Sequence, residues 1–318
     1  MRIVNHMPYT CSVVVPVYNS ESTLQELAAR LEIALKQLCY QYELILVNDG
    51  SHDQSWKVIL QLTKEYSWIT GINMMRNYGQ HNALLCGVRA ARYEITITMD
   101  DDLQHPPEEI KFLLEKLAEG YDVVYGVPKK LPHSFWRNLF SKITKRILAL
   151  VMGIPNIRDI GSFRAFRTNL RKAFENYQSP NVILDVLLSW GTSHFATIPV
   201  DQAPRQMGHS NYNFSRLITH AILILTGYST APLRLASMVG FGFTVFGFII
   251  FIYVVSTYFF SGSIPGFPFL ASIIALFSGT QLFVIGIFGE YLARIFDRSM
   301  DRPAYVISET VNETSTKE

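Results

Sequence analysis

Hydrophobic and polar positions follow two different periods along residues 1–210. Short runs of aliphatic and β-branched residues recur, and the longer segments between them return an apolar residue every three or four positions. The short runs predict buried strands, and the longer segments predict amphipathic helices. The expected strands are 12–16, 43–47, 69–74, 94–99 and 122–125, and the expected helices are 22–38, 54–66, 82–92 and 107–117.

This alternation of strands and helices predicts an α/β domain with a mostly parallel sheet covered on both faces. In such sheets the ligand binds beyond the carboxyl ends of the strands. Polar motifs stand at those ends, since 48–51 follows one expected strand and 100–102 follows another. The pattern therefore places a candidate site at one edge of the sheet.

A different pattern covers residues 235–289, which contain no Asp, Glu, Lys or Arg. A bilayer-spanning helix takes about 20 apolar residues, so this stretch predicts two spans, 235–260 and 267–289, joined by a turn. A pair of buried core helices is the alternative. The chain is 17% charged and 49% hydrophobic, and the charge deficit is concentrated in this stretch.

The charges that flank the two spans predict their orientation. Arg234 precedes the first span, and the second is followed by Arg294, Arg298 and Arg302. The positive-inside rule then predicts an integral protein of the inner or plasma membrane, with the α/β domain and both termini in the cytoplasm. An odd number of cysteines, three in all, also favours a reducing compartment.

Two further segments are amphipathic. Segment 135–152 has an apolar stripe beside Lys142, Lys145 and Arg146. Basic amphipathic helices lie in the membrane interface, where these cations would attract a lipid phosphate; packing against the α/β domain is the alternative. The expected organisation is an α/β domain at 1–210, which contains 135–152, a juxtamembrane amphipathic segment at 211–234, a two-helix hairpin at 235–289 and a cytoplasmic tail at 290–318.

The candidate chemistry centres on Asp100, Asp101 and Asp102. Adjacent carboxylates repel one another unless a cation neutralises them, and hard oxygen ligands suit Mg²⁺ or Mn²⁺. Such an ion needs few protein ligands where substrate phosphates complete its shell. A solvated acidic turn is the alternative. The net charge of +2 gives no reason to expect a nucleic-acid partner.

Four polar blocks occur in order along the α/β region. They are Pro16-Val17-Tyr18-Asn19, Asn48-Asp49-Gly50-Ser51, Arg76-Asn77-Tyr78-Gly79 and Asp100-Asp101-Asp102-Leu103-Gln104-His105-Pro106-Pro107-Glu108. The series resembles family 2 glycosyltransferases with the GT-A fold, and within them the polyprenyl-phosphate glycosyltransferases, which include dolichol-phosphate mannose synthase and the ArnC-type and GtrB-type enzymes. The resemblance covers nearly the whole chain, and it is to the GtrB type above all.

The resemblance implies roles for individual residues. A nucleotide donor would be bound by Pro16, Tyr18, Asn19, Asp49, Arg76 and Asp100. The carboxylate of Asp49 would accept a hydrogen bond from a uracil ring. The metal would be bound by Asp102, Gln104 and Asp100, and the two aspartates would thereby act in catalysis. The middle residue of the triplet, Asp101, varies in the family and is assigned no role.

Two later blocks also resemble family elements. In the first, at 159–167, Arg164 is expected to contact a phosphate, because guanidinium forks suit phosphate oxygens. Asp159 is expected to position either the acceptor or a basic side chain. In the second, Arg205 and Ser210 would reach the diphosphate when their loop closes over the site.

The chain departs from the family at Gly126-Val127-Pro128, where many relatives carry Gly-Ser-Arg. One expected cation is therefore missing. Either Lys129 or Lys130 replaces it, or the diphosphate relies on Arg164 and Arg205.

The reaction implied by the resemblance is the inverting, metal-dependent transfer of a sugar, with glucose preferred, from a uridine diphosphate donor to a polyprenyl phosphate at the cytoplasmic face of the bilayer. Mannose, N-acetylglucosamine or a modified arabinose are the alternative sugars. A membrane-anchored nucleotide-sugar-binding protein without catalysis is a rival of another class. The sequence leaves self-association open.

Overall fold

The computed structural model describes residues 9–129, 161–203, 228–261 and 266–312. The chain divides into two units, one made of residues 1–217 and 301–318 and the other of residues 218–300. Each unit is described by itself. The described strands and helices within 1–210 lie in the first unit, and those within 235–289 lie in the second.

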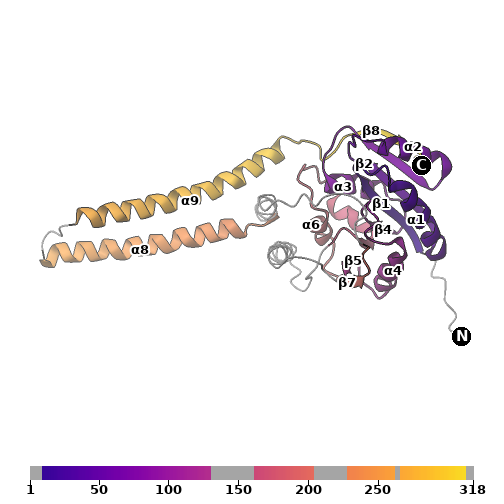
Figure 1. The fold of residues 1–318 in the computed structure, drawn as a ribbon. Coiled ribbons are helices and arrows are strands. Elements are labelled where there is room, and N and C mark those ends of the chain that lie inside the picture. Colours follow the sequence, from indigo (N-terminus) through magenta and orange to yellow (C-terminus); the bar gives the residue numbers. More distant parts are fainter. Residues whose placement is uncertain (1–8, 130–160, 204–227, 262–265, 313–318) are drawn as a thin grey trace. The chain divides into compact units, whose positions relative to one another are not determined.

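The first unit alternates strands and helices in the predicted order (Figure 1). Its elements are β1 (Tyr9–Val17), α1 (Leu24–Leu38), β2 (Cys39–Asn48), α2 (Ser55–Glu65), β3 (Ile69–Met74), α3 (Gln80–Ala90), β4 (Ile95–Thr98), η1 (Pro107–Glu109), α4 (Ile110–Ala118), β5 (Val123–Pro128), β6 (Arg164–Arg167), η2 (Thr168–Phe174), α6 (Leu184–Ser189), β7 (Phe195–Val200) and β8 (Ile307–Val311).

These strands form one eight-stranded sheet in the order β7-β5-β6-β4-β1-β2-β3-β8. The centre of the sheet is parallel, because β1 pairs in parallel with β2 and β4, and β2 pairs in parallel with β3. Strand β6 runs antiparallel between β4 and β5, and β8 runs antiparallel to β3. The sheet is thus mixed but mostly parallel at the site.

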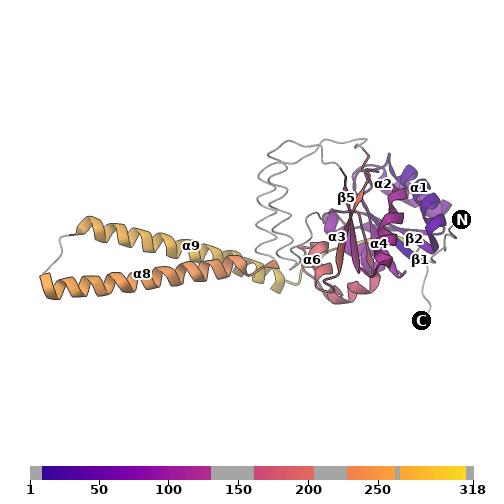
Figure 2. The same ribbon diagram turned by 90° about the horizontal axis from the view of Figure 1, so that it is seen from below.

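Helices cover both faces of the sheet (Figure 2). Alternate residues of β1 explain this, since Val13 and Val15 pack with α1, α2 and α4, whereas Val14 packs with α3 and α6. All three valines are fully buried. A strand buried on both faces has a continuous apolar run, which is why this run predicted a buried strand.

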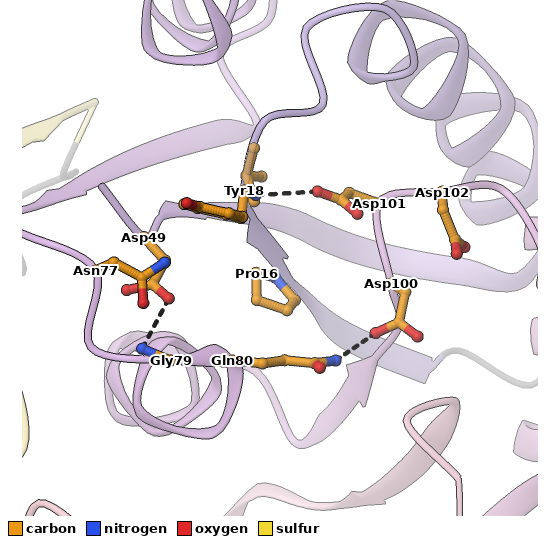
Figure 3. Close-up of a pocket in the computed structure, with 10 residues that line it drawn as sticks. Pro16, Tyr18, Asp49, Asn77, Gly79, Gln80, Asp100, Asp101 and Asp102 are labelled. Carbon is orange, nitrogen blue, oxygen red and sulfur yellow. Dashed lines mark hydrogen bonds between the residues drawn. The ribbon is translucent and has the colours of Figure 1, made fainter. Parts of the chain in front are cut away.

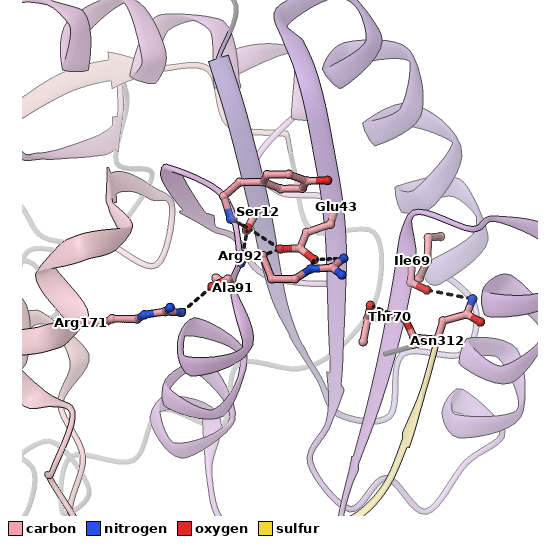
Figure 4. A network of polar contacts seen from close by, with 9 residues as sticks. Ser12, Glu43, Ile69, Thr70, Ala91, Arg92, Arg171 and Asn312 are labelled. Carbon is pink, nitrogen blue, oxygen red and sulfur yellow. Dashed lines mark hydrogen bonds and ion pairs between the residues drawn. The ribbon is translucent and has the colours of Figure 1, made fainter. Parts of the chain in front are cut away.

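The C-terminal residues correct one predicted boundary. Residues 290–318 were expected to be a cytoplasmic tail, but β8 adds an edge strand to the sheet of the first unit. Asn312 strengthens this attachment, because its amide donates to the carbonyl oxygens of Thr63 and Ile69. Figure 4 shows the contact with Ile69. The hydroxyl of Thr70 donates in turn to the carbonyl oxygen of Asn312 at 3.3 Å. The α/β unit is therefore completed by residues that follow the hairpin.

The second unit contains two long helices, α8 (Ala231–Ser261) and α9 (Phe267–Ser299). Each includes a segment long and apolar enough to cross a membrane, Pro232–Thr257 and Leu276–Ser299, and neither segment is buried in the structure. The alternative of two buried core helices therefore does not fit. The second helix continues beyond the predicted end at Gly289, where Arg294 pairs with Glu290 at 2.8 Å. The rings of Phe243 and Phe277 meet edge to face at 5.8 Å between the two helices.

Candidate active site

A pocket of about 310 Å³ lies at the carboxyl ends of β1, β2 and β4 (Figure 3). Loops that leave these strands line it, together with the start of α3. The lining residues are Pro16, Val17, Tyr18, Asp49, Asn77, Gly79, Gln80, Asp100, Asp101 and Asp102. The pocket lies at the edge of the sheet where the sequence pattern predicted a ligand site.

Asp49 holds the loop between β3 and α3 against the end of β2. Its carboxylate accepts hydrogen bonds from the backbone N–H groups of Tyr78, at 2.7 Å, and Gly79, at 2.9 Å. Burial raises the pKa of Asp49, and these two donors oppose the rise. The close approach of this loop to the end of β2 also requires Gly50. Its φ is +64°, and a Cβ there would overlap the backbone of Asn77. Contact of Asp49 with a uracil ring stays a prediction.

Asp100 forms another wall of the pocket. Its Oδ1 accepts a hydrogen bond from the side-chain amide of Gln80 at 2.6 Å, and its Oδ2 accepts one from the hydroxyl of Ser162 at 2.5 Å. Burial raises the pKa of Asp100, while the hydrogen bond from Ser162 lowers it. Neither Gln80 nor Ser162 was a predicted site residue.

Asp101, which the family resemblance left without a role, also lines the pocket. Its Oδ2 accepts a hydrogen bond from the backbone N–H of Tyr18 at 3.2 Å, which joins the end of β4 to the end of β1. Burial raises the pKa of Asp101 to about 6. Its position between two predicted site residues, at the end of a central strand, was the signal that could have identified it.

Asp102 and Gln104 form a tight turn. The backbone N–H of Gln104 donates to Asp102 Oδ1 at 3.1 Å, and its side-chain amide donates to Oδ2 at 2.6 Å. Leu103 between them has a φ of +57°, a left-handed conformation uncommon for leucine, and its buried side chain keeps it there. The turn therefore brings the two predicted metal ligands together.

The donor set of this edge fits a divalent cation of the Mg²⁺ or Mn²⁺ kind, because it offers carboxylate and amide oxygens. Among the described residues, no three His, Cys, Asp or Glu side chains gather closely enough to hold an ion by themselves. An ion held by one or two carboxylates would complete its shell with water and phosphate oxygens. The residues present fit that arrangement.

The predicted phosphate contact of Arg164 requires a correction. Its side chain is 1% exposed and forms an ion pair with Asp185, which is also buried. Its Nε donates to the hydroxyl of Thr98 at 2.9 Å, and the hydroxyl of Tyr125 donates to Asp185 at 2.9 Å. A guanidinium so enclosed has no open face for a phosphate, so the predicted direct contact is wrong for this structure.

The other predicted residues fall into three groups. Pro16 and Tyr18 line the pocket. Asn19 accepts a hydrogen bond from the backbone of His52 at 2.8 Å, and exposed Arg76 lies 4.5 Å over the ring of Tyr78, but neither is a lining residue. Outside the described residues lie Asp159, Arg205, Ser210, Lys142, Lys145 and Arg146, together with segment 135–152 and most of segment 211–234.

Five lining residues were not assigned an individual role from the sequence, namely Val17, Asn77, Gly79, Gln80 and Asp101. Three of them stand in or beside the block at 76–79, which was recognised only as a motif. That block follows strand β3 directly, so its place in the chain was the available signal.

A mostly parallel sheet with an acidic pocket at its carboxyl edge is typical of nucleotide-binding α/β enzymes. The model of the family "Glycosyl transferase family 2" matches residues 12–176. The chain is 36% identical over 312 residues to an undecaprenyl-phosphate 4-deoxy-4-formamido-L-arabinose transferase from Shewanella sediminis, covering 96% of this chain and 94% of the relative. It is 35% identical over 314 residues to the protein of the same description from Klebsiella pneumoniae, covering 96% of each.

Solved structures agree on the fold. Glucosyl-3-phosphoglycerate synthase from Mycobacterium tuberculosis, in complex with Mn²⁺ and UDP-glucose, aligns with a TM-score of 0.51 and 17% identity over 69% of this chain and 77% of that one. The chain belongs to glycosyl transferase family 2, with a GT-A domain and the activity of a glycosyltransferase.

Proposed function

We propose that this glycosyltransferase moves a sugar from a nucleoside diphosphate donor to a polyprenyl phosphate at a membrane surface, with help from a divalent metal ion. The observation that carries the proposal is the acidic pocket at 100–102 in a chain that also has two helices long enough to span a bilayer. The relatives from Shewanella sediminis and Klebsiella pneumoniae are named for sugar transfer to undecaprenyl phosphate, which supports the same acceptor class.

The donor would occupy the pocket with its nucleoside between Tyr18 and the loop held by Asp49. Uridine is the base we propose, on the resemblance of the block at 48–51. The diphosphate would then lie toward Asp100 and Asp102, at the end of β4. This orientation uses the aromatic and backbone groups at one end of the pocket and the carboxylates at the other.

The metal would be bound by Asp102 and Asp100, with the side-chain oxygen of Gln104 as a further ligand. When bound, it would offset the charge that develops on the diphosphate leaving group. At present Gln104 Oε1 accepts a hydrogen bond from the amide of Gln202 at 2.9 Å. Binding of a metal ion to Gln104 Oε1 would therefore compete with the hydrogen bond from Gln202.

The acceptor does not require a strong general base. A phosphate monoester has a second pKa of about 6, so most of it carries two negative charges at pH 7. Asp159 would then orient the acceptor rather than deprotonate it. Inversion at the anomeric carbon follows from the family resemblance, and the two helices would hold the site beside the lipid that carries the acceptor.

The sugar is the least constrained part of the proposal. The resemblance to GtrB-type enzymes favoured glucose, whereas the curated relatives named above transfer 4-deoxy-4-formamido-L-arabinose. We therefore place the modified arabinose ahead of glucose, mannose and N-acetylglucosamine. A screen of the corresponding nucleotide sugars with the purified protein, undecaprenyl phosphate and MnCl₂ or MgCl₂ tests this order. Transfer of glucose alone would reverse it.

A further inference from the structure

The carboxylate of Asp100 is held from two sides by donors on different elements. The amide of Gln80, at the start of α3, donates to Oδ1 at 2.6 Å, and this contact is visible across the pocket in Figure 3. The hydroxyl of Ser162, two residues before β6 begins, donates to Oδ2 at 2.5 Å. Each oxygen therefore has one fixed partner and keeps further capacity to accept.

Ser162 is itself fixed from the core. Its backbone carbonyl accepts a hydrogen bond from the hydroxyl of Thr98 at 2.7 Å, and that hydroxyl accepts one from Arg164 at 2.9 Å. Arg164 pairs with Asp185, and both are buried. A continuous chain of polar contacts thus runs from a buried ion pair to a carboxylate on the pocket wall.

Three consecutive carboxylates make this support necessary. Repulsion among Asp100, Asp101 and Asp102 and the burial of Asp100 both disfavour a fixed, ionised side chain. Hydrogen bonds to a carboxylate are stronger than neutral ones, and two of them, one to each oxygen, favour one rotamer. A side chain that is already ordered loses less conformational freedom when a ligand binds.

We propose that Gln80 and Ser162 are positioning residues that fix the carboxylate of Asp100 for the metal–diphosphate part of the donor. The inference rests on the proposed function, because it takes the occupant of the pocket to be a nucleoside diphosphate with a divalent ion. In this account Arg164 acts through Thr98 and the backbone of Ser162, and it does not touch the donor.

The test measures binding of UDP in the presence of MnCl₂ to the full chain in detergent, by isothermal titration calorimetry. Ser162→Ala and Gln80→Ala should each weaken binding about tenfold, since each removes one hydrogen bond to a charged group. Ser162→Thr keeps the hydroxyl and should stay within about threefold of the unmodified protein. The matched control is Ser189→Ala, whose hydroxyl donates at 2.7 Å to a carbonyl of its own helix and should not change binding.

A double-mutant cycle separates positioning from folding. In an Asp100→Ala background the same two substitutions should change binding by less than about twofold, because their partner is gone. Undiminished losses in that background would overturn the inference, and so would unchanged binding in both single variants. If Ser162→Ala does not fold, the cycle is measured with Gln80→Ala alone, because Gln80 is exposed and its replacement leaves the core intact. If the unmodified protein does not bind UDP in an Mn²⁺-dependent way, both the proposed donor class and this inference are wrong. If it binds UDP and the variants bind equally well, only the inference is wrong.

Discussion

The backbone N–H of Gly79 donates a hydrogen bond to Asp49 Oδ2 at 2.9 Å, and this contact joins the end of β2 to the loop that begins α3. The same loop carries Asn77 and Gln80, which line the pocket. Asp49 is only 3% exposed, so water does not readily replace its carboxylate as an acceptor. One buried side chain therefore sets the position of one wall of the site.

Replacing Asp49 by alanine should loosen that wall. Two backbone donors would lose their acceptor, which should lower the free energy of unfolding by about 2–3 kcal/mol and weaken UDP binding at least tenfold. Urea unfolding followed by tryptophan fluorescence measures the first effect, and calorimetry measures the second. Glu65→Gln, on the exposed end of α2, is the control. Unchanged stability and binding in Asp49→Ala would show that the loop is held by other contacts.

The buried pair of Arg164 and Asp185 gives a second prediction. Arg164→Met leaves a buried carboxylate without its partner and should cost about 3–5 kcal/mol of unfolding free energy. The double variant Arg164→Met/Asp185→Leu should recover much of that loss, because it removes both charges. Urea unfolding of the three proteins measures both effects. A single variant that is fully stable but has lost donor binding would restore the rejected idea of a direct phosphate contact.

The attachment of β8 predicts that two truncations differ. A chain that ends at Met300 loses the edge strand and the hydrogen bonds of Asn312, and it should unfold at a clearly lower temperature. A chain that ends at Asn312 keeps all of these contacts and should match the full protein. Thermal unfolding in the same detergent compares them. Equal midpoints for both truncations would show that β8 adds nothing to the stability of the α/β unit.

Removal of divalent ions should abolish sugar transfer, because the diphosphate would then leave without charge stabilisation. Treatment with EDTA followed by dialysis, and then addition of MnCl₂ or MgCl₂, measures the loss and its recovery. Asp102→Asn should remain folded and should require a much higher metal concentration. Full activity in the presence of excess EDTA would exclude this role for the metal.

The sequence predicted the central strands and helices well, because buried parallel strands and amphipathic helices have strong periods. Strand β8 was not predicted, for a physical reason. It is a short edge strand with three exposed residues, and its partner β3 lies more than two hundred positions earlier in the chain. No local pattern carries that pairing.

The candidate site was likewise predicted in part. The strand-end motifs located the pocket, but the sequence could not show that Arg164 turns inward to Asp185, because the burial of a charge depends on a partner from another element. Nor could it show that Asp101 bonds to the backbone of Tyr18, since that contact depends on the adjacency of β1 and β4 in the sheet.

In the proposed reaction, release of the nucleoside diphosphate and glycosylation of the lipid are one event. The most direct measurement incubates the purified full chain with a nucleotide sugar, MnCl₂ and undecaprenyl phosphate in liposomes, and compares the diphosphate released with the glycosylated lipid detected by mass spectrometry. Equal amounts of the two products are expected, both dependent on the lipid phosphate and both strongly reduced in Asp102→Asn at the same MnCl₂ concentration. Diphosphate release at the same rate without the lipid phosphate, and with no glycosylated lipid formed from any donor tested, would contradict the proposed reaction.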